Sequence, residues 1–424
     1  MKNRFTKYRV ILTTLSVFAV FAKSTLLFAQ SGISNARSVA MGGAYTALAR
    51  GVEAPAWNPA NLALSGENIY HFNLISVGVG FHNNSFSKKQ YNLYNGRFLT
   101  PEDKQNILTS IPSQGLRVDF DTEVQAMSIS LGSFAFTATG LAASDFTLSK
   151  DIVDLVLNGN EFNRTYNIGA TGGEGWGISS FGLSAAFPIS IPAFHEFTLG
   201  ASFKYLKGFA YGKVKEASST IMTEVDGIHG TGRVVIDRAL GGSGLAFDFG
   251  TAASLNKKWS MSLSVTNLFN FINWGYETKR FTYAFTADSL SIEKIEDTDI
   301  DSVFSDSKQT TDIESFNTTL PSELRLGIAR TTKRLLLAVD IVQGLKKRAG
   351  VSTTPKIALG TELRLIHFFP MRAGFSIGGK RGFSSSAGFA LDFSIFSWDF
   401  AVSNQGGLFS GRGLGVAFAW MFRF

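Results

Sequence analysis

The chain ends in GLGVAFAWMFRF (residues 413–424), a stretch in which every even-numbered residue is large and apolar. The odd-numbered residues are mostly small, and one of them, Arg423, is charged. A repeat of two residues is typical of a β-strand, because successive side chains point to opposite faces. The C-terminus therefore predicts a strand with one strongly apolar face and one unlike face.

The same alternation recurs upstream, for example in residues 197–205, 259–266, 335–341 and 389–393. A soluble β-sandwich also alternates, so the repeat alone does not decide the fold class. Two features favour a membrane barrel: the apolar face is dense in Phe, Trp and Leu, and aromatic residues gather at the strand ends. A closed barrel is also the only sheet that pairs every backbone amide in lipid.

The spacing of these segments predicts about fourteen antiparallel strands. They are residues 69–81, 123–132, 134–146, 176–187, 195–207, 243–255, 258–269, 320–331, 334–343, 355–366, 370–379, 384–394, 396–404 and 413–424. Short and long connections alternate between them, as expected for periplasmic turns and extracellular loops, with both ends of the mature chain in the periplasm. We therefore predict an all-β transmembrane outer-membrane barrel over residues 67–424.

The long connections carry weaker signals. Residues 100–111 and 150–157 are expected to form short helices, and residues 230–238 are a candidate extra hairpin arm. Residues 297–301 (DTDID) resemble the beginning of a calcium loop but lack its glycine and distal glutamate, so a solvated acidic loop is the better interpretation.

The five histidines show no metal-ligand spacing and no catalytic motif occurs, so neither a metal, a cofactor nor an enzyme is predicted.

Residues 1–29 have the layout of a signal peptide, with basic residues, a short apolar run and a small residue at position 29. An N-terminal membrane anchor is the alternative, but the apolar run is shorter than the roughly 20 residues that span a bilayer. Five Lys/Arg and no acid lie in this segment, so its removal would reduce the formal charge from +7 to +2. The basic excess thus does not indicate a nucleic-acid partner, and the absence of cysteine excludes disulfides and thiolate metal sites.

Between the signal and the first strand, residues 36–49 read ARSVAMGGAYTALA and residues 53–62 read EAPAWNPANL. This stretch resembles the N-terminal plug of FadL-like outer-membrane barrels, which are channels for long-chain fatty acids and other hydrophobic compounds. The related PorV-like barrels of type IX secretion begin in a similar way. The resemblance implies a plug, or hatch, over residues 30–66 inside a fourteen-stranded barrel. Its matching residues are Arg37, Met41, Gly42, Gly43, Tyr45, Trp57, Asn58, Pro59 and Ala60.

Whether this plug moves as a gate or is a fixed structural stopper stays open at this point. Its physical properties suit either role. Met41 and Tyr45 supply apolar surface, Gly42 and Gly43 allow a tight bend, and Pro59 stops helical continuation.

The two-residue alternation along each predicted strand assigns a set of charged residues to the face that points into the lumen of the barrel. A charge facing lipid at mid-membrane would cost about 2–4 kcal/mol, so pairing in the lumen is favoured. We expect these charges to brace the barrel, and to hold Arg37, Arg50 and Glu53 of the plug, rather than to bind substrate. They are Lys204, Asp248, Arg325, Asp340, Glu362, Arg364, Arg372, Asp392, Asp399 and Arg423.

The terminal strand carries a second resemblance. Outer-membrane barrels commonly end in phenylalanine after an alternating strand, a signal for the barrel-assembly machinery, and Trp420, Phe422 and Phe424 fit that pattern. An ordinary buried terminal strand is the alternative interpretation.

Together these features predict a protein of the Gram-negative outer membrane, in contact with its lipid and lipopolysaccharide. The resemblance implies uptake of small hydrophobic molecules through the plugged lumen, with residues 82–122 and 208–242 collecting the ligand. The alternative is a non-transporting barrel that docks a partner in secretion or surface-protein assembly, as PorV-like proteins do. A surface adhesin comes third.

Overall fold

The computed structural model describes residues 32–65, 70–290, 304–349, 351–393, 395–407 and 411–424. The predicted signal peptide (residues 1–29) and the DTDID segment (residues 297–301) lie outside these ranges. No helix within them is long and apolar enough to cross a bilayer.

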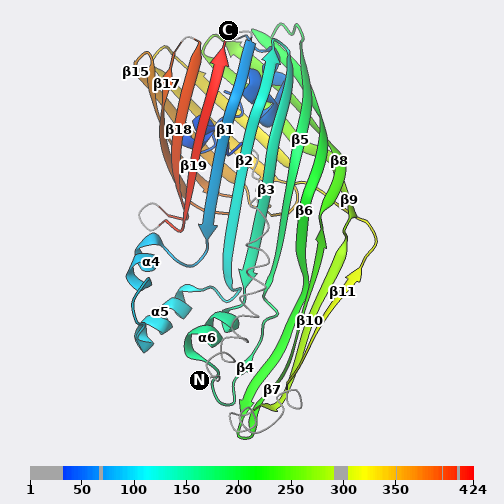
Figure 1. Ribbon diagram of the computed structural model, residues 1–424. Helices are drawn as coiled ribbons and strands as arrows, with labels where there is room; N and C mark the ends of the chain where they lie inside the picture. The colour runs from blue at the N-terminus through cyan, green and yellow to red at the C-terminus, as the bar shows by residue number, and fades with distance from the viewer. Residues whose placement is uncertain (1–31, 66–69, 291–303, 350, 394, 408–410) are drawn as a thin grey trace.

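Fourteen strands close into one antiparallel barrel, which confirms the predicted number and order (Figure 1). Each strand pairs with its neighbours along the chain, and the last pairs with the first, Phe418 lying opposite Val77. Every predicted strand overlaps one of them. The strands are β1 Tyr70–Asn83, β2 Leu116–Leu131, β3 Phe134–Leu148, β5 Gly172–Pro188, β6 Glu196–Glu224, β8 Gly241–Asn256, β9 Trp259–Tyr276, β13 Glu323–Thr331, β14 Leu335–Gly344, β15 Lys356–Ile366, β16 Phe369–Gly378, β17 Ser384–Asp392, β18 Phe396–Gln405 and β19 Gly413–Arg423.

Strand β14 shows how the sequence builds this wall. Leu335, Leu337 and Val339 are exposed on the outer surface, whereas Leu336 and Asp340 are buried on the lumen side. The exposed residues are apolar because their surroundings are lipid, and the buried face admits a charge because the lumen offers it partners. Period two thus predicts which side each residue faces.

Four consecutive segments continue the sheet beyond the barrel, at the end opposite the C-terminus (Figure 1). The outer part of β6 pairs with β7 (Gly227–Ala239), β7 with β10 (Lys279–Leu290), and β10 with β11 (Phe304–Asp312). Two short strands complete it: β4 (Thr165–Tyr166) pairs with β6, and β12 (Phe316–Thr318) pairs with β9. The predicted hairpin arm at residues 230–238 is confirmed. The connections 208–242 and 270–319, which the predicted strands left as loops, contain strands of this sheet, so that prediction was wrong.

Three helices lie at the same end, outside the barrel wall (Figure 1). They are α4 (Lys88–Tyr94), α5 (Pro101–Ser110) and α6 (Lys150–Asn158). Thr100 caps α5 by accepting a hydrogen bond from the Asp103 amide, and Ser149 caps α6 through the Ile152 amide. The two helices predicted from the sequence are therefore confirmed, and α4 is an addition.

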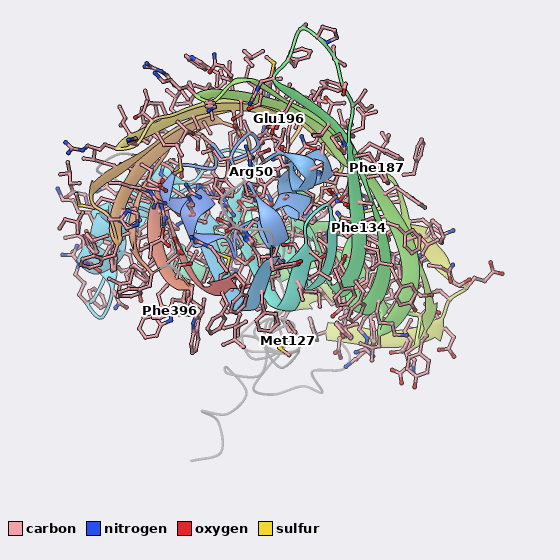
Figure 2. All side chains as sticks on the ribbon, turned by 90° about the horizontal axis from the view of Figure 1, so that it is seen from above. Arg50, Met127, Phe134, Phe187, Glu196 and Phe396 are labelled. Carbon is pink, nitrogen blue, oxygen red and sulfur yellow. The ribbon has the colours of Figure 1, made fainter. Side chains whose placement is uncertain are left out.

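Residues 32–65, which we call the plug segment, lie inside the ring of strands (Figure 2). The segment consists of four short helices: α2 (Ala36–Ala40), η1 (Gly51–Glu53), α3 (Ala54–Trp57) and η2 (Pro59–Ala63). Viewed down the barrel axis, Arg50 is within the ring, whereas Phe187 and Phe396 are on its outer side (Figure 2). The plug segment occupies the half of the lumen nearest the short turns and the C-terminus (Figure 1).

Candidate functional site: the lumen between the plug and the outer loops

An ion-pair network joins the first plug helix to the wall. Arg37 Nε lies 2.8 Å from Glu362 Oε2 on β15, and Arg372 Nε of β16 lies 2.8 Å from the same oxygen. Arg372 also pairs with Asp399 of β18. Glu362, Arg372 and Asp399 are all nearly inaccessible to solvent. The network is therefore a buried clamp between the plug segment and three strands.

The network continues to the end of the chain. Arg364 contacts both Glu362 (2.8 Å) and Asp392 (3.0 Å), and Arg423 Nη1 lies 2.9 Å from Asp392 Oδ1. These charges face the lumen, as the alternation along the strands indicated, and they lie near the short turns. The structure thus brings together six of the ten predicted lumen charges, including Arg423 of the last strand.

Asp340 of β14 makes a second anchor. Its Oδ2 accepts hydrogen bonds from the amides of Tyr45 (2.9 Å) and Thr46 (2.8 Å) and from the Thr46 hydroxyl (2.6 Å). Asp340 is fully buried. Since a buried carboxylate needs hydrogen-bond donors, these three bonds fix the plug backbone at one point of the wall.

A third contact between the plug and the wall joins Trp57 of the plug to Arg325 of β13. The Arg325 guanidinium carbon lies 4.5 Å from the Trp57 ring centroid, and the Ser264 hydroxyl donates to Trp57 O at 2.6 Å. Tyr45 packs edge-on against Trp57 with 5.5 Å between ring centroids. Both aromatic rings are buried in one apolar cluster with Met41.

The NPA sequence at residues 58–60 is held to the wall by hydrogen bonds between uncharged groups. Asn58 Nδ2 donates to Thr251 O of β8 at 2.8 Å, and its Oδ1 accepts from the Ala60 amide at 2.9 Å, which caps η2. Thr198 Oγ1 of β6 donates to Ala60 O at 2.8 Å. Pro59 at the first position of η2 needs no amide partner. Gly250 of β8 admits this approach, because a Cβ there would lie 1.9 Å from Asn58 Oδ1.

Gly42 and Gly43 form the tight bend expected between α2 and the rest of the plug segment. Their φ angles are +69° and +90°, a region that side chains disfavour. A Cβ on Gly42 would also lie 2.8 Å from the Phe375 backbone nitrogen of β16. The bend therefore lets the plug touch the wall directly.

Two expectations about the plug charges were wrong. Glu53 is bonded within the plug, accepting from Tyr45 Oη and from Asn35 Nδ2, both at 2.6 Å. Arg50 donates to the carbonyls of Ala47 and Ala49 and forms no ion pair in the described part of the chain. The plug backbone turns back on itself at these positions, so its own groups are nearer than the wall.

Asp248, another predicted lumen charge, does not reach the plug. Its carboxylate pairs with Lys204 of β6 at 2.5 Å and accepts from the Asn267 amide at 2.7 Å. This contact braces the wall between β6, β8 and β9.

Two loops fold inward over the outer end of the lumen. Arg348, in the connection after β14, lies 3.1 Å from Glu174 on β5, five strands away around the barrel, and 3.1 Å from Thr319 Oγ1. In the connection after β16, Lys380 lies 2.5 Å from Asp119 on β2 and 2.8 Å from Asp145 on β3, and Arg381 pairs with Asp121. These residues were not predicted from the sequence, because loop positions have no periodic signal.

A cavity of about 130 Å³ lies between the plug and these loops. Gly42, Gly43 and Trp57 of the plug line one side, and Val351, Ser352 and Thr354 of the loop after β14 line another. We call this cavity the chamber. Its remaining lining combines Gly, Ser and several charges with Ile and Val side chains, so it presents both polar and apolar surface.

A separate apolar cluster lines the outer lumen along β5, β6, β8 and β9. Trp274, Tyr211 and Ile272 are buried in it, and Trp176 and Phe316 pack against it while partly exposed. The Tyr211 and Trp274 ring centroids are 5.4 Å apart. The outer lumen thus has one apolar side and one polar side.

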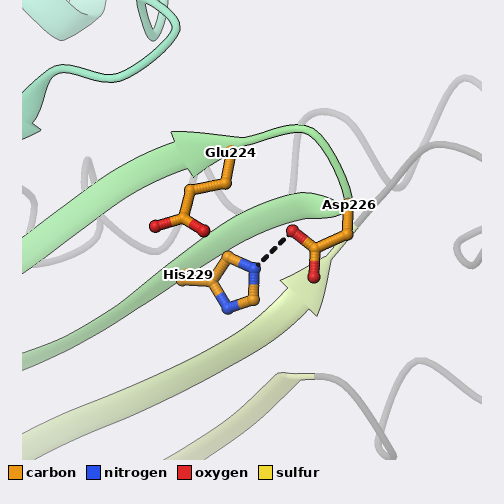
Figure 3. Close-up of side chains that lie close together, drawn as sticks. All are labelled: Glu224, Asp226 and His229. Carbon is orange, nitrogen blue, oxygen red and sulfur yellow. Dashed lines mark hydrogen bonds and ion pairs between the residues drawn. The ribbon is translucent and has the colours of Figure 1, made fainter.

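At the tip of the β6–β7 hairpin, Glu224, Asp226 and His229 lie together (Figure 3). Their possible ligand atoms are within 4.8 Å of one another, a grouping that sequence spacing did not predict. Both carboxylates are exposed, and His229 Nε2 is 2.9 Å from Asp226 Oδ1. An ordinary ion pair accounts for this geometry.

The end of the chain completes the wall. Phe424 exchanges backbone hydrogen bonds with Tyr70 of β1, and the Trp420 and Phe422 rings lie 5.9 Å apart between centroids on the outer surface. Their proposed role as an assembly signal stays a prediction.

The closed antiparallel barrel of fourteen strands, with a chain segment inside its lumen, is a fold that this chain shares with solved outer-membrane channels. The crystal structure of the P. putida toluene transporter TodX aligns over 94% of this chain and 99% of its own, with TM-score 0.53 and 13% identity. The TodX deltaS2S3 mutant, a monoaromatic hydrocarbon channel, aligns over 92% and 98%, with TM-score 0.56 and 12% identity. At such identities the likeness concerns the fold alone.

The chain belongs to a family of unknown function, DUF5723, whose sequence profile matches residues 59–402. No curated protein matches the sequence.

Proposed function

We propose that this protein is a gated channel of the bacterial outer membrane that takes up small hydrophobic molecules. The observation that carries the proposal is the division of the lumen: a plug closes one half, inward loops close the other, and a small chamber lies between them. Fold likeness to a toluene transporter supports the ligand class by analogy.

The apolar cluster supplies a route for such a ligand. A molecule arriving beside the prolonged sheet meets Trp176 and Phe316, which are partly exposed at the lumen surface of that cluster. Movement of the loop after β14 would then admit it to the chamber and to the plug bend. Uptake requires that the ligand bind the open arrangement more tightly than the closed one, because only differential affinity shifts such an equilibrium.

The test is uptake of labelled toluene by Gram-negative cells that produce the chain, compared with cells that produce no barrel. Faster entry is expected, and it should fall when the lumen is filled by Gly43→Trp in a chain that still inserts. Equal entry rates with and without the protein would contradict the proposal.

Docking of a protein partner is the second candidate, favoured by the sheet that projects beyond the barrel. Its outermost described strand, β11, has almost all its residues exposed and pairs only with β10 within the described ranges. Mass spectrometry of the molecules that co-purify with the protein in mild detergent distinguishes docking from transport. A stoichiometric protein partner without any small hydrophobic ligand would favour docking over transport.

A further inference from the structure

Two basic side chains enter the chamber at the same height on the wall. Arg325 on β13 lies opposite Val342 on β14, and Val342 lies opposite Lys356 on β15. With strands roughly 4.8 Å apart, the Cα atoms of Arg325 and Lys356 are about 10 Å from each other. All three residues line the chamber.

Lys356 has no anionic partner. Within the described residues, no carboxylate oxygen lies within 4.0 Å of its ammonium nitrogen, and no hydrogen-bond acceptor is in reach. The ammonium lies above the plug bend, 2.8 Å from the point where a Cβ of Gly43 would be. A bare ammonium is thus presented to the chamber directly over the plug.

The guanidinium donors of Arg325 are only partly hydrogen-bonded. It pairs with Glu323 through Nη2 and packs on Trp57, but its Nε finds no acceptor in the described part of the chain, and the residue is 3% exposed. Buried donors without acceptors are costly, so an acceptor brought by a ligand would be favoured.

Each nearby carboxylate has a partner for one of its oxygens, although Asp121 Oδ2 and Asp340 Oδ1 accept no hydrogen bond in the described part of the chain. Glu323 pairs with Arg325, Asp121 with Arg381, and Asp340 accepts three hydrogen bonds from the plug. Of the four cations that line the chamber, Arg325 pairs with Glu323, Arg381 with Asp121, and Lys380 with Asp119 and Asp145, so within the described residues Lys356 is the cation left without a carboxylate. A recess with low-dielectric walls and spare positive charge concentrates anions.

We propose that the chamber binds a small oxyanion, a free carboxylate or phosphate group, through Lys356 with Arg325 beside it. A volume of about 130 Å³ suits a ligand of few atoms, since drug-sized ligands need about 300–1,000 Å³. The serine hydroxyls and the unpaired ammonium in its lining also suit a small anion. This site goes beyond the proposed uptake of hydrophobic molecules and does not depend on transport.

The test is isothermal titration calorimetry at low salt on the detergent-solubilised mature barrel, with inorganic phosphate and with butyrate as separate probes. Saturable binding of one or both is expected, and the probe that binds identifies the oxyanion. Lys356→Gln should weaken that binding about tenfold or more, because a charge-assisted contact is lost. Lys356→Arg should restore much of it, and Lys258→Gln, the same change at an exposed turn, should leave it unaltered.

Folding of each variant is checked by its heat-dependent mobility on gels. Absence of saturable binding to the wild-type barrel, or equal affinities for the wild type and Lys356→Gln, would overturn the proposal. A failure of toluene uptake would instead contradict the transport proposal and leave these binding results unaffected.

Discussion

The two ends of the lumen are closed in different ways. Toward the short turns, the plug segment is held to the wall by the Arg37–Glu362 ion pair and by hydrogen bonds, among them those to Asp340 on one side and to Thr251 on the other. Toward the outer end, two loops reach across the lumen through ion pairs, with Arg348–Glu174 on one loop and Lys380 and Arg381 on the other.

This difference has an energetic consequence. Removing one partner of a buried ion pair costs about 3–5 kcal/mol, because the other charge is left uncompensated. More accessible pairs contribute about 0–1 kcal/mol each and weaken with salt. Arg348 and Glu174 retain 17% and 14% side-chain exposure, whereas Asp340 and Asn58, which fix the plug to the wall, are fully buried. The loop after β14 is therefore expected to open more readily than the plug, and also more readily than the loop after β16, where Lys380 and Asp119 retain only 8% and 3%.

The largest effect should follow loss of Arg372. Arg372→Met leaves Asp399 buried without its ion-pair partner, so we expect a loss of about 3–5 kcal/mol in the free energy of unfolding. Guanidinium unfolding of the barrel in detergent measures it. Arg334→Met, which removes an exposed charge at a neighbouring turn, is the matched control and should change little. Equal effects of the two variants would show that the clamp does not stabilise the barrel.

Loss of Arg348 should affect access rather than stability. Because the chain contains no cysteine, Ser352→Cys in the chamber can be labelled alone by a charged thiol reagent. Adding Arg348→Ala removes the contacts to Glu174 and Thr319, so labelling should become several-fold faster.

The control is Lys346→Ala in the same loop, an exposed residue, which should leave the labelling rate unchanged. The wild-type background should also label faster at high salt. Labelling that is insensitive to both Arg348→Ala and salt would mean that this loop does not close the outer end.

The smallest effect concerns the exposed hairpin tip. The hydrogen bond to Asp226, helped by the charges of Asp226, Glu224 and Asp288, raises the pKa of His229 above its ordinary 6.5. The contact therefore stabilises the tip fully below about pH 6.5 and loses its effect as pH rises through the higher folded pKa. An NMR titration should show this raised pKa and its return toward 6.5 in Asp226→Asn. A His229 pKa at or below 6.5 in the unmodified chain would contradict the contact.

Alternation along the strands was enough to predict the barrel. Where lipid contacts one face, side chains such as Leu335 and Leu337 must be apolar, so the sequence records which residues face outward. In the part of the sheet beyond the barrel, the outermost described strand, β11, is exposed along almost its whole length. Residues 304–312 (FSDSKQTTD) therefore carry no such pattern and looked like a loop.

The contacts within the lumen were less predictable. Parity indicated that Glu362 and Asp340 face inward, but not that one would meet Arg37 and the other the amides of Tyr45 and Thr46. Those pairings depend on how the plug sits against the strands, across about 300 residues of sequence. Arg348 and Lys380 lie in irregular loops, where no repeat indicates their direction. Their partners follow only from the closed geometry.

The central claim is that the plug segment closes the lumen at the end near the short turns. Single-channel conductance in planar bilayers tests it most directly, by comparing the mature chain with a variant lacking residues 36–62 that retains the heat-dependent gel mobility of a folded barrel. We predict a low conductance for the mature chain and a large, stable increase for the deletion variant. An unchanged conductance in the folded deletion variant would contradict the claim.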